Sequence, residues 1–372
     1  MAQGHADQTR VLSSQRRSAR GKLQETAAPS ATAESLGLRE AALHRRRVLW
    51  GLVALTLLVV GAASLSGRYP APYWMPPRLL LEDPLARQIF FNLRLPRILA
   101  ALLLGMTLAG AGTVFQMIFR NPLVEPGFLG VSQGAAFGAA LSIVAWNAGS
   151  AGIQVSAAAF GFLGLLLSDR LARRIRYGGW TLRLVLAGIA VSALFSAGVG
   201  LLKYVADPLT QLPDLVFWMM GALWGVTWSK ALSILPVTVI ALLFLLLMRW
   251  RLNVLALDEA TAFSLGASPA RERMALLLAA VAAVSAVVSI SGVVGWIGLI
   301  VPHLARRLLG ADAQTALPGA LLIGGAFAVL CDTLARSLLA GEIPLGILAS
   351  LIGAAIFIVL MLAQPRTAML SG

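Results

Sequence analysis

The sequence has few of the residues that build disulfides, metal clusters and nucleotide sites. One cysteine, Cys331, and three widely separated histidines exclude a disulfide framework and a Cys/His metal cluster. The chain has three lysines, Lys22, Lys203 and Lys230, and none is followed by serine or threonine. A phosphate-binding loop of the G-x-x-x-x-G-K-[ST] type needs that pairing. The chain therefore has no such site, and an ATP-driven role requires a separate ATPase.

Charged residues are also scarce, at 12% of the chain, whereas 58% of the residues are hydrophobic. Soluble domains are about 25% charged and about 45–50% apolar. The mean hydropathy is +0.82. This composition argues against a soluble enzyme and predicts an all-α integral membrane protein. The net charge of +14 fits basic cytoplasmic loops better than a nucleic-acid partner.

Apolar runs recur along the chain at lengths near the roughly 20 residues that a helix needs to cross a bilayer. Ten such runs predict ten transmembrane helices, near residues 48–66, 98–118, 129–148, 152–168, 182–202, 231–248, 274–293, 294–310, 315–335 and 345–363. The 67–97 connection carries Pro70, Pro72, Pro76 and Pro77 and is predicted to be an irregular outer loop. The stretch 204–230 predicts a short helix at the outer face.

Residues 1–47 contain nine Arg/Lys and four acids, which predicts a disordered basic cytoplasmic tail before a ten-helix transmembrane domain at 48–366. A mitochondrial transit peptide is an alternative, whereas a signal peptide is excluded because 47 residues precede the first apolar run. The loops expected inside carry 22 Arg/Lys and those expected outside carry 8. This bias predicts that both termini are cytoplasmic.

Two short segments resemble each other. Gly127-Phe-Leu-Gly-Val131 recurs as Gly295-Trp-Ile-Gly-Leu299, 168 residues later. The copies lie five spans apart, an odd number, so they would cross the membrane in opposite directions. Inverted repeats are common in transporters, and a chance match in Gly/Leu-rich helices is the alternative.

The predicted spans contain almost no ionisable side chain. Asp332 lies four residues before Arg336, so the two are expected to pair across one helical turn. Ion-coupled carriers usually place a charged residue at mid-membrane, and an embedded enzyme needs a cluster of reactive groups. His303 stands alone beside Arg306 and Arg307. No catalytic residue and no metal site are therefore predicted.

Small residues, arginines and one polar loop are the other features. Gly130, Gly134 and Gly138 form a face suited to close helix packing. Three arginines, Arg94, Arg97 and Arg336, go against the inside bias and are expected to be exposed outside. There they would dock an acidic partner; the alternatives are contact with lipid headgroups and local pairing. The inner 249–273 loop predicts an amphipathic helix over 252–260 that Gly266 ends. This helix would rest on a cytosolic partner or cap the bundle.

Five ordered motifs resemble those of the FecCD permeases, the membrane subunits of binding-protein-dependent ABC importers for iron-siderophore, haem and vitamin B12. They are R-L-P-R at 94–97, R-N-P-L-V-E-P-G-F-L-G-V-S at 120–132, the 252–266 loop, G-W-I-G-L-I-V-P-H at 295–303 and D-T-L-A-R at 332–336. The similarity covers roughly residues 48–365. It implies a homodimer with the type II importer fold, one path at the dimer axis, two ATPase subunits inside and a periplasmic binding protein outside.

The resemblance also implies roles for particular residues. Arg94, Arg97 and Arg336 would receive glutamates from the two lobes of the binding protein. The coupling helix pair, seated in a cleft of the ATPase, would comprise Leu252, Asn253, Leu255, Ala256, Leu257, Glu259, Ala260 and Gly266. The cytoplasmic gate would comprise Asn121, Leu123, Thr181 and Leu182. No cofactor is implied, because the partner subunit binds ATP.

The substrate and location follow only from the family. An iron complex, as siderophore or haem, is the first expectation, with cobalamin and molybdate or tungstate as alternatives. A secondary transporter coupled to ions is the alternative from another class. The expected location is the bacterial inner membrane.

Overall fold

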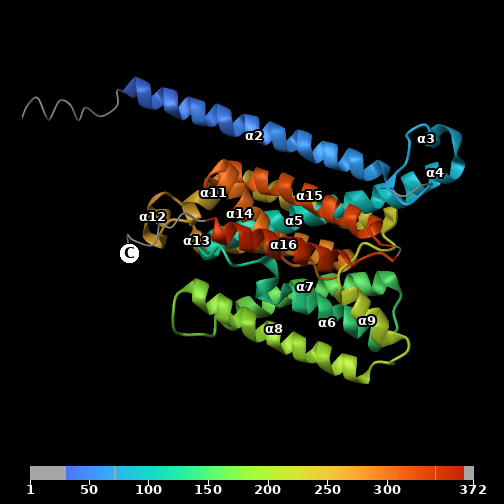
Figure 1. Cartoon of the computed structure of the whole chain (residues 1–372). Coiled ribbons are helices and arrows are strands. Elements are labelled where there is room, and N and C mark those ends of the chain that lie inside the picture. The colour runs from blue at the N-terminus through green and yellow to red at the C-terminus, as the bar shows by residue number, and fades with distance from the viewer. Residues whose placement is uncertain (1–30, 71–72, 340, 364–372) are drawn as a thin grey trace, which may run out of the picture. The chain divides into compact units, whose positions relative to one another are not determined.

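The computed structural model describes residues 31–70, 73–339 and 341–363. This part of the chain is almost entirely helical (Figure 1), and its β structure is one antiparallel pair, β1 (Ser66–Gly67) with β2 (Tyr73–Trp74). The helices are α2 (Ala31–Leu65), α3 (Leu79–Glu82), α4 (Pro84–Gln88), the π-helical η1 (Ile89–Arg94), α5 (Leu95–Phe119), the 3-10 helix η2 (Pro126–Leu129), α6 (Val131–Val144), α7 (Ser150–Ala172), α8 (Trp180–Val205), α9 (Gln211–Met219), α10 (Trp228–Leu247), α11 (Arg249–Leu255), α12 (Glu259–Ser264), α13 (Pro269–Ser291), α14 (Ile297–Leu309), α15 (Ala313–Ser337) and α16 (Leu345–Leu362).

The chain divides into two units, Met1–Val48 and Leu49–Gly372. Residues 1–30 of the predicted disordered tail lie outside the described residues. Residues 31–47 do not have the predicted disorder, because α2 begins at Ala31 and continues into the first apolar run. Alanine, leucine, glutamate and arginine dominate this stretch and favour a helix.

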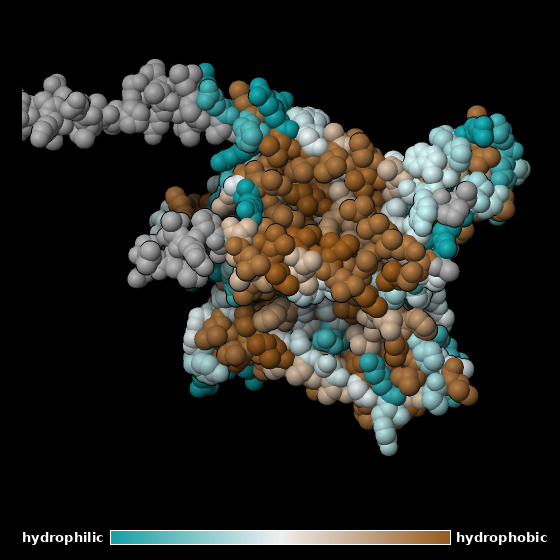
Figure 2. Space-filling model, viewed as in Figure 1, coloured by the Kyte–Doolittle hydropathy of each residue, from teal (hydrophilic) through white to brown (hydrophobic). Residues whose placement is uncertain are grey.

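Eight of the described helices are long and apolar enough to cross a membrane. They cover Ala42–Leu65, Pro84–Phe119, Ser150–Ala172, Trp180–Val205, Trp228–Leu247, Pro269–Ser291, Ala313–Ser337 and Leu345–Leu362. Figure 2 shows an apolar face over α15 and α16, with hydrophilic residues gathered toward its two ends. The chain is a multi-pass membrane protein, as its composition predicts.

The other two predicted spans form helices shorter than a full crossing. The 129–148 run gives α6, with 14 residues, and the 294–310 run gives α14, with 13. Fourteen helical residues rise about 21 Å, less than the roughly 30 Å hydrocarbon core. The chain breaks before each helix, at Gly130 (φ 81°) and at Trp296 (φ 70°). Each copy of the repeated motif thus contains a break followed by a short helix, although the break is at the fourth residue of the first copy and at the second residue of the other.

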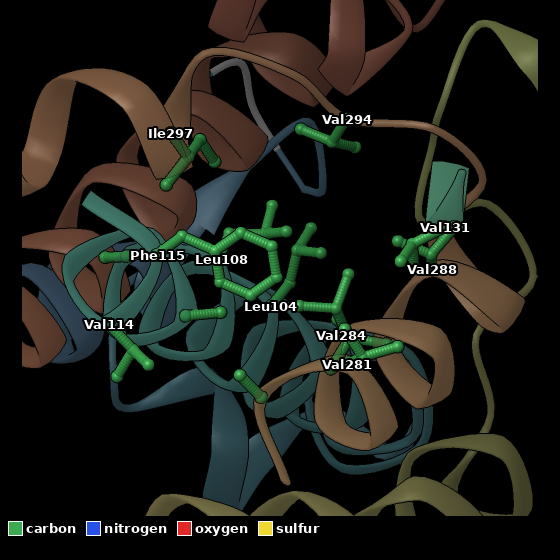
Figure 3. Packing of buried hydrophobic residues seen from close by; sticks show 14 of the residues in the cluster. Leu104, Leu108, Val114, Phe115, Val131, Val281, Val284, Val288, Val294 and Ile297 are labelled. Carbon is green, nitrogen blue, oxygen red and sulfur yellow. The ribbon is translucent and has the colours of Figure 1, made fainter. Parts of the chain in front are cut away.

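Helix α5 lies at the centre and packs against α10, α13, α14 and α15, whereas α6, α7 and α8 pack on one another. Figure 3 shows Leu108 and Phe115 of α5 among side chains of α13 and α14, including Val284 and Ile297. Since non-helical backbone inside a membrane must be covered by protein, α5, which packs against both η2 and α14, provides part of the surroundings that the two breaks require.

Glycines let the central helices approach closely. A Cβ on Gly105 of α5 would meet the carbonyl oxygen of Gly324 in α15, and a Cβ on Gly324 would meet that of Gly105. Gly134 and Gly138 of α6 face the α7 backbone in the same way. The packing function predicted for the small-residue face is confirmed.

The 67–97 connection differs from the predicted irregular loop. Its second half is helical and runs through α4 and η1 into α5, so that Pro84–Phe119 is continuous. Asp83 starts this helix, since its carboxylate accepts from the Leu85 N–H at 2.9 Å and Pro84 follows it. Proline at the first helical position favours a start rather than a break. Arg94 and Arg97 are therefore on a helix.

Candidate functional site

Three arginines cluster where α5 begins and α15 ends, as their positions in the motifs suggest. Arg94 lies on η1, Arg97 on the first turn of α5 and Arg336 on the last turn of α15. Together with Arg68, Tyr69 and Glu342 they line a cavity of about 440 Å³, which we call the arginine cavity. The helical start at Asp83 and the close α5–α15 packing bring these distant motifs together.

Arg94 is buried, with 5% of its surface exposed. Its Nη1 donates to the Ser64 carbonyl at 3.2 Å, and its Nη2 donates to the Tyr69 carbonyl at 3.1 Å. A Cβ on Gly67 would lie 2.5 Å from the same Nη2. Arg94 thus fixes the segment that follows α2.

Arg97 pairs with two acids. Its Nε lies 2.9 Å from Asp332 Oδ1, and its Nη1 lies 2.8 Å from Glu342 Oε2 and 3.1 Å from Oε1. The Arg97 side chain is 13% exposed, Asp332 is 1% exposed and Glu342 is 38% exposed. One arginine therefore joins α5 to α15 and to the segment that leads into α16.

Arg336 completes the cluster. Its Nε lies 3.7 Å from Asp332 Oδ2, so the pairing predicted from the four-residue spacing is confirmed. Its Nη1 donates to the Ser66 carbonyl at 2.8 Å, and its Nη2 donates to the Ala63 carbonyl. The expected exposure of the three arginines is wrong, and the alternative of local pairing is confirmed, because carbonyls and acids of this chain engage all three. Docking at this cluster stays a prediction.

Glu342 was not predicted from the sequence. It lies in the short connection between α15 and α16, among glycine and proline residues that suggest only a turn. The charge of Glu342 is the one sequence feature that could have indicated it, because this acid follows Asp332 and Arg336 closely in the chain and is expected at the same end of the molecule. The close pairing across α5 and α15 is a tertiary contact that one-dimensional spacing does not show.

The predicted coupling segment forms two helices instead of one. α11 ends at Leu255, and Asp258 caps α12 by accepting from the Thr261 N–H at 2.9 Å. The Thr261 hydroxyl and backbone N–H hold the pKa of Asp258 below its usual range. Gly266 has φ 74° and ends the segment, as expected. A helix pair, which the resemblance implies, is therefore present.

The residues of this segment divide into anchors and exposed positions. Leu252 and Leu255 are fully buried, and Asn253 Nδ2 donates to Asp312 Oδ1 at 2.7 Å at the start of α15. Leu252 and Leu255 pack inward, so the prediction that they contact the ATPase is wrong. Ala256 is only partly exposed. The remaining predicted residues are exposed: Leu257, Glu259, Ala260 and Gly266. Phe263, 74% exposed, and Leu265 were missed and present apolar surface on and beside α12.

The predicted gate residues lie on two neighbouring segments. Asn121 and Leu123 follow α5 and are exposed, with Asn121 Oδ1 accepting from the Leu123 N–H at 2.9 Å. Thr181 and Leu182 lie on the first turn of α8, where Leu182 is exposed. The residues preceding each segment, Phe119 and Trp180, stack with ring centroids 6.1 Å apart. The structure thus brings the two predicted gate elements to one end of the bundle.

A cavity of about 340 Å³ lies where the two broken helices meet. It is lined by the segment Glu125–Phe128 from the first break and Val293–Gly295 from the second, with Ile189 and Ser192 of α8. Among the described residues, no group of three His, Cys, Asp or Glu side chains is placed to hold a metal ion. Both copies of the repeated motif therefore line the same cavity.

Broken helices that meet around a central packed helix in a multi-pass bundle are typical of membrane transport proteins. Residues 31–363 match the family described as the FecCD transport family, so the chain belongs to this family. It is a transport permease.

Relatives and a solved structure support this membership over most of the chain. The molybdate import system permease protein MolB of Haemophilus influenzae is 41% identical over 328 residues, covering 86% of this chain and 97% of that protein. The hemin transport system permease protein HmuU of Yersinia pestis is 41% identical over 284 residues, covering 74% and 84%. A metal-chelate type ABC transporter in an inward-facing conformation has a TM-score of 0.80, 40% identity and coverage of 86% and 100%.

Proposed function

We propose that this chain is the membrane permease of a binding-protein-dependent ABC importer that moves an iron complex, a siderophore or haem, across the bacterial inner membrane. The observation that carries the proposal is the family match over residues 31–363. The named haemin permease relative supports iron as cargo. In this proposal the chain forms a homodimer, binds no cofactor and has both termini in the cytoplasm, in accordance with its arginine distribution.

Two cytoplasmic ATPase subunits supply the energy. The exposed positions of α11–α12 support docking there, because Phe263 and Leu265 offer apolar surface beside the acid Glu259. ATP binding by the partner biases the permease between states only if it binds those states with different affinity. The predicted gate segments, at residues 121–123 and 181–182, lie at the end of the bundle that such docking would move.

A periplasmic binding protein delivers the cargo at the opposite end. Four arginines line the arginine cavity, where the acid Glu342 is the single carboxylate among the described lining residues. This excess of positive charge suits acidic side chains of a partner.

The decisive experiment is uptake in a strain that lacks this chain, with radioactive iron supplied as siderophore and as haem, and with labelled cobalamin alongside. Loss of iron uptake, restored by the wild-type chain, supports the proposal. Unchanged iron uptake with lost cobalamin uptake moves the cargo to corrinoids. Uptake that collapses with an uncoupler while ATP is maintained contradicts ATP drive and favours an ion-coupled carrier.

Molybdate or tungstate is a second candidate cargo. It is favoured by the molybdate permease relative, whose similarity extends over 97% of that protein. Labelled molybdate belongs in the same uptake assay. Loss of molybdate uptake with unchanged uptake of every iron complex would replace the iron assignment.

A further inference from the structure

Arg97 is occupied on two edges by carboxylates of its own chain. Its Nε edge holds Asp332, and its Nη1 edge holds both oxygens of Glu342, at 2.8 and 3.1 Å. A guanidinium offers its donors in a fixed planar fork. An acidic side chain arriving from outside therefore finds Nε and Nη1 already engaged, and it can take the Nη1 position only by displacing Glu342.

The two internal acids differ in how easily they can be replaced. Asp332 is enclosed, at 1% exposure, and also lies against Arg336. Glu342 is far more exposed and lines the arginine cavity. A buried carboxylate that loses its partner is costly, whereas partly exposed ion pairs contribute little and exchange readily. Asp332 is the permanent partner of Arg97, and Glu342 is the replaceable one.

We infer that Glu342 holds the place of a partner carboxylate on Arg97 and leaves it when an acidic side chain of the binding protein docks. This inference rests on the docking proposed above. The cavity provides room, at about 440 Å³, and four arginines provide charge for the arriving carboxylate. Arg97 exchanges one carboxylate for another, so its charge is never left unpaired.

The exchange has a structural consequence, because Glu342 belongs to the connection between α15 and α16. Next to it, the Ile343 N–H donates to the Ala335 carbonyl at 3.1 Å, and the Gly346 N–H donates to the Gly221 carbonyl at 3.0 Å. Gly221 follows α9. Release of Glu342 loosens this connection. Docking of the binding protein therefore changes the contacts between the segment after α9 and the start of α16.

The first test is affinity. The probe is the purified periplasmic binding protein whose deletion gives the same uptake defect as deletion of this chain, and the complete permease–ATPase complex is held in lipid nanodiscs. Glu342→Gln removes the internal competitor while keeping side-chain size, so binding should tighten roughly two- to fivefold, the range of a partly exposed ion pair. Glu342→Asp should lie near the wild type. Glu82→Gln, at an exposed acid of α3, is the matched control and should leave affinity unchanged.

The second test is hydrogen exchange at the Ile343 and Gly346 amides. In the wild type, both should exchange faster when the binding protein is present, and in Glu342→Gln the faster exchange of Ile343 should already be seen without it. Equal or weaker binding by Glu342→Gln, or unchanged exchange on docking, overturns the inference. A wild-type complex that binds no periplasmic protein instead overturns the proposed docking itself.

Discussion

The Asp332 carboxylate lies between two arginines, with Oδ1 2.9 Å from Arg97 Nε and Oδ2 3.7 Å from Arg336 Nε. These side chains come from α5 and α15, the helices that also approach closely at their glycines. The carboxylate therefore compensates buried charge at the point where α5 begins and α15 ends.

Removal of this carboxylate should destabilise the protein strongly. We expect Asp332→Ala to cost about 3–5 kcal/mol, because two buried guanidinium groups lose their shared partner. The measurement is thermal unfolding of the purified protein in detergent. Glu342→Gln is the comparison, with an expected cost of about 0.2–1 kcal/mol, since its pair with Arg97 is partly exposed. Equal losses for the two variants would contradict this division.

The contact between α5 and α15 should not tolerate a single added methyl group. Gly105→Ala places a Cβ against the Gly324 carbonyl, and overpacking of this kind costs about 1–3 kcal/mol. Gly61→Ala in α2 is the matched control, since nothing lies within 4 Å of its added Cβ and alanine favours a helix by up to about 1 kcal/mol. The same thermal assay should show opposite signs. If Gly105→Ala left the thermal stability unchanged, α5 and α15 would be able to move apart at no cost in free energy.

The apolar runs predicted eight of the spans well, because run length and hydropathy report directly on the membrane. They did not predict that α6 and α14 would be short. The break at Trp296 places a non-glycine residue at φ 70°, a conformation that surrounding packing must impose. The local sequence does not show which tertiary contacts impose this conformation. The repeated Gly-x-x-Gly motif nevertheless marked the two segments in which the breaks before α6 and α14 lie.

Residue roles were harder to predict than spans. Spacing alone identified the Asp332–Arg336 pair, since it lies within one helix. The Arg97–Glu342 pair joins residues 245 positions apart, so only the fold brings it together. The predicted exposure of the three arginines was wrong for a related reason. Charged side chains generally lie at the surface, but carbonyls and carboxylates of this chain accept hydrogen bonds from these guanidinium groups.

Phe263 should be required for association with the ATPase. We expect Phe263→Asp to weaken copurification of the ATPase at least tenfold, because buried aromatic residues often dominate an interface. The measurement is the amount of ATPase retained on tagged permease as ATPase concentration is varied. Phe217→Asp in α9 is the control, since this exposed aromatic lies on a helix outside the coupling segment. Equal loss in both variants would indicate misfolding rather than a lost contact.

The cap at Asp258 should hold α12 through neutral pH and fail only in strong acid. Its pKa is lowered by the Thr261 hydroxyl and backbone N–H. The carboxylate therefore contributes stability above its unfolded pKa, about 3.9, and loses it as pH falls through the lower folded value. We expect the Thr261 amide to stay protected from hydrogen exchange from pH 7 to about 4 and to lose protection below that.

Two variants separate the cap from its charge. Asp258→Asn should retain a cap that does not depend on pH, because asparagine caps well without ionising. Asp258→Ala should lack protection at every pH. Loss of wild-type protection already at pH 5 to 6 would contradict the lowered pKa.

Trp180 should link the coupling segment to the gate. Its ring stacks on Phe119 with an interplanar angle of 18°, and the Arg273 guanidinium carbon lies 5.8 Å from its centroid. Arg273 Nη2 in turn donates to the Leu255 carbonyl at the end of α11, at 3.2 Å. This is a continuous set of contacts, and only a functional measurement can show that it carries coupling.

We expect Trp180→Ala to reduce uptake about tenfold or more in proteoliposomes while the assembled complex keeps most of its ATP hydrolysis, because the ATPase still docks but no longer moves the gate. A tenfold effect corresponds to about 1.4 kcal/mol of lost coupling. Trp180→Phe should recover uptake, since a ring can still stack on Phe119. Trp146→Ala, at an exposed tryptophan between α6 and α7, is the control and should leave the ratio of uptake to hydrolysis unchanged. A proportional fall of uptake and hydrolysis in Trp180→Ala would assign this residue to assembly alone, because a packing defect lowers the number of active complexes without changing how many substrates each ATP moves.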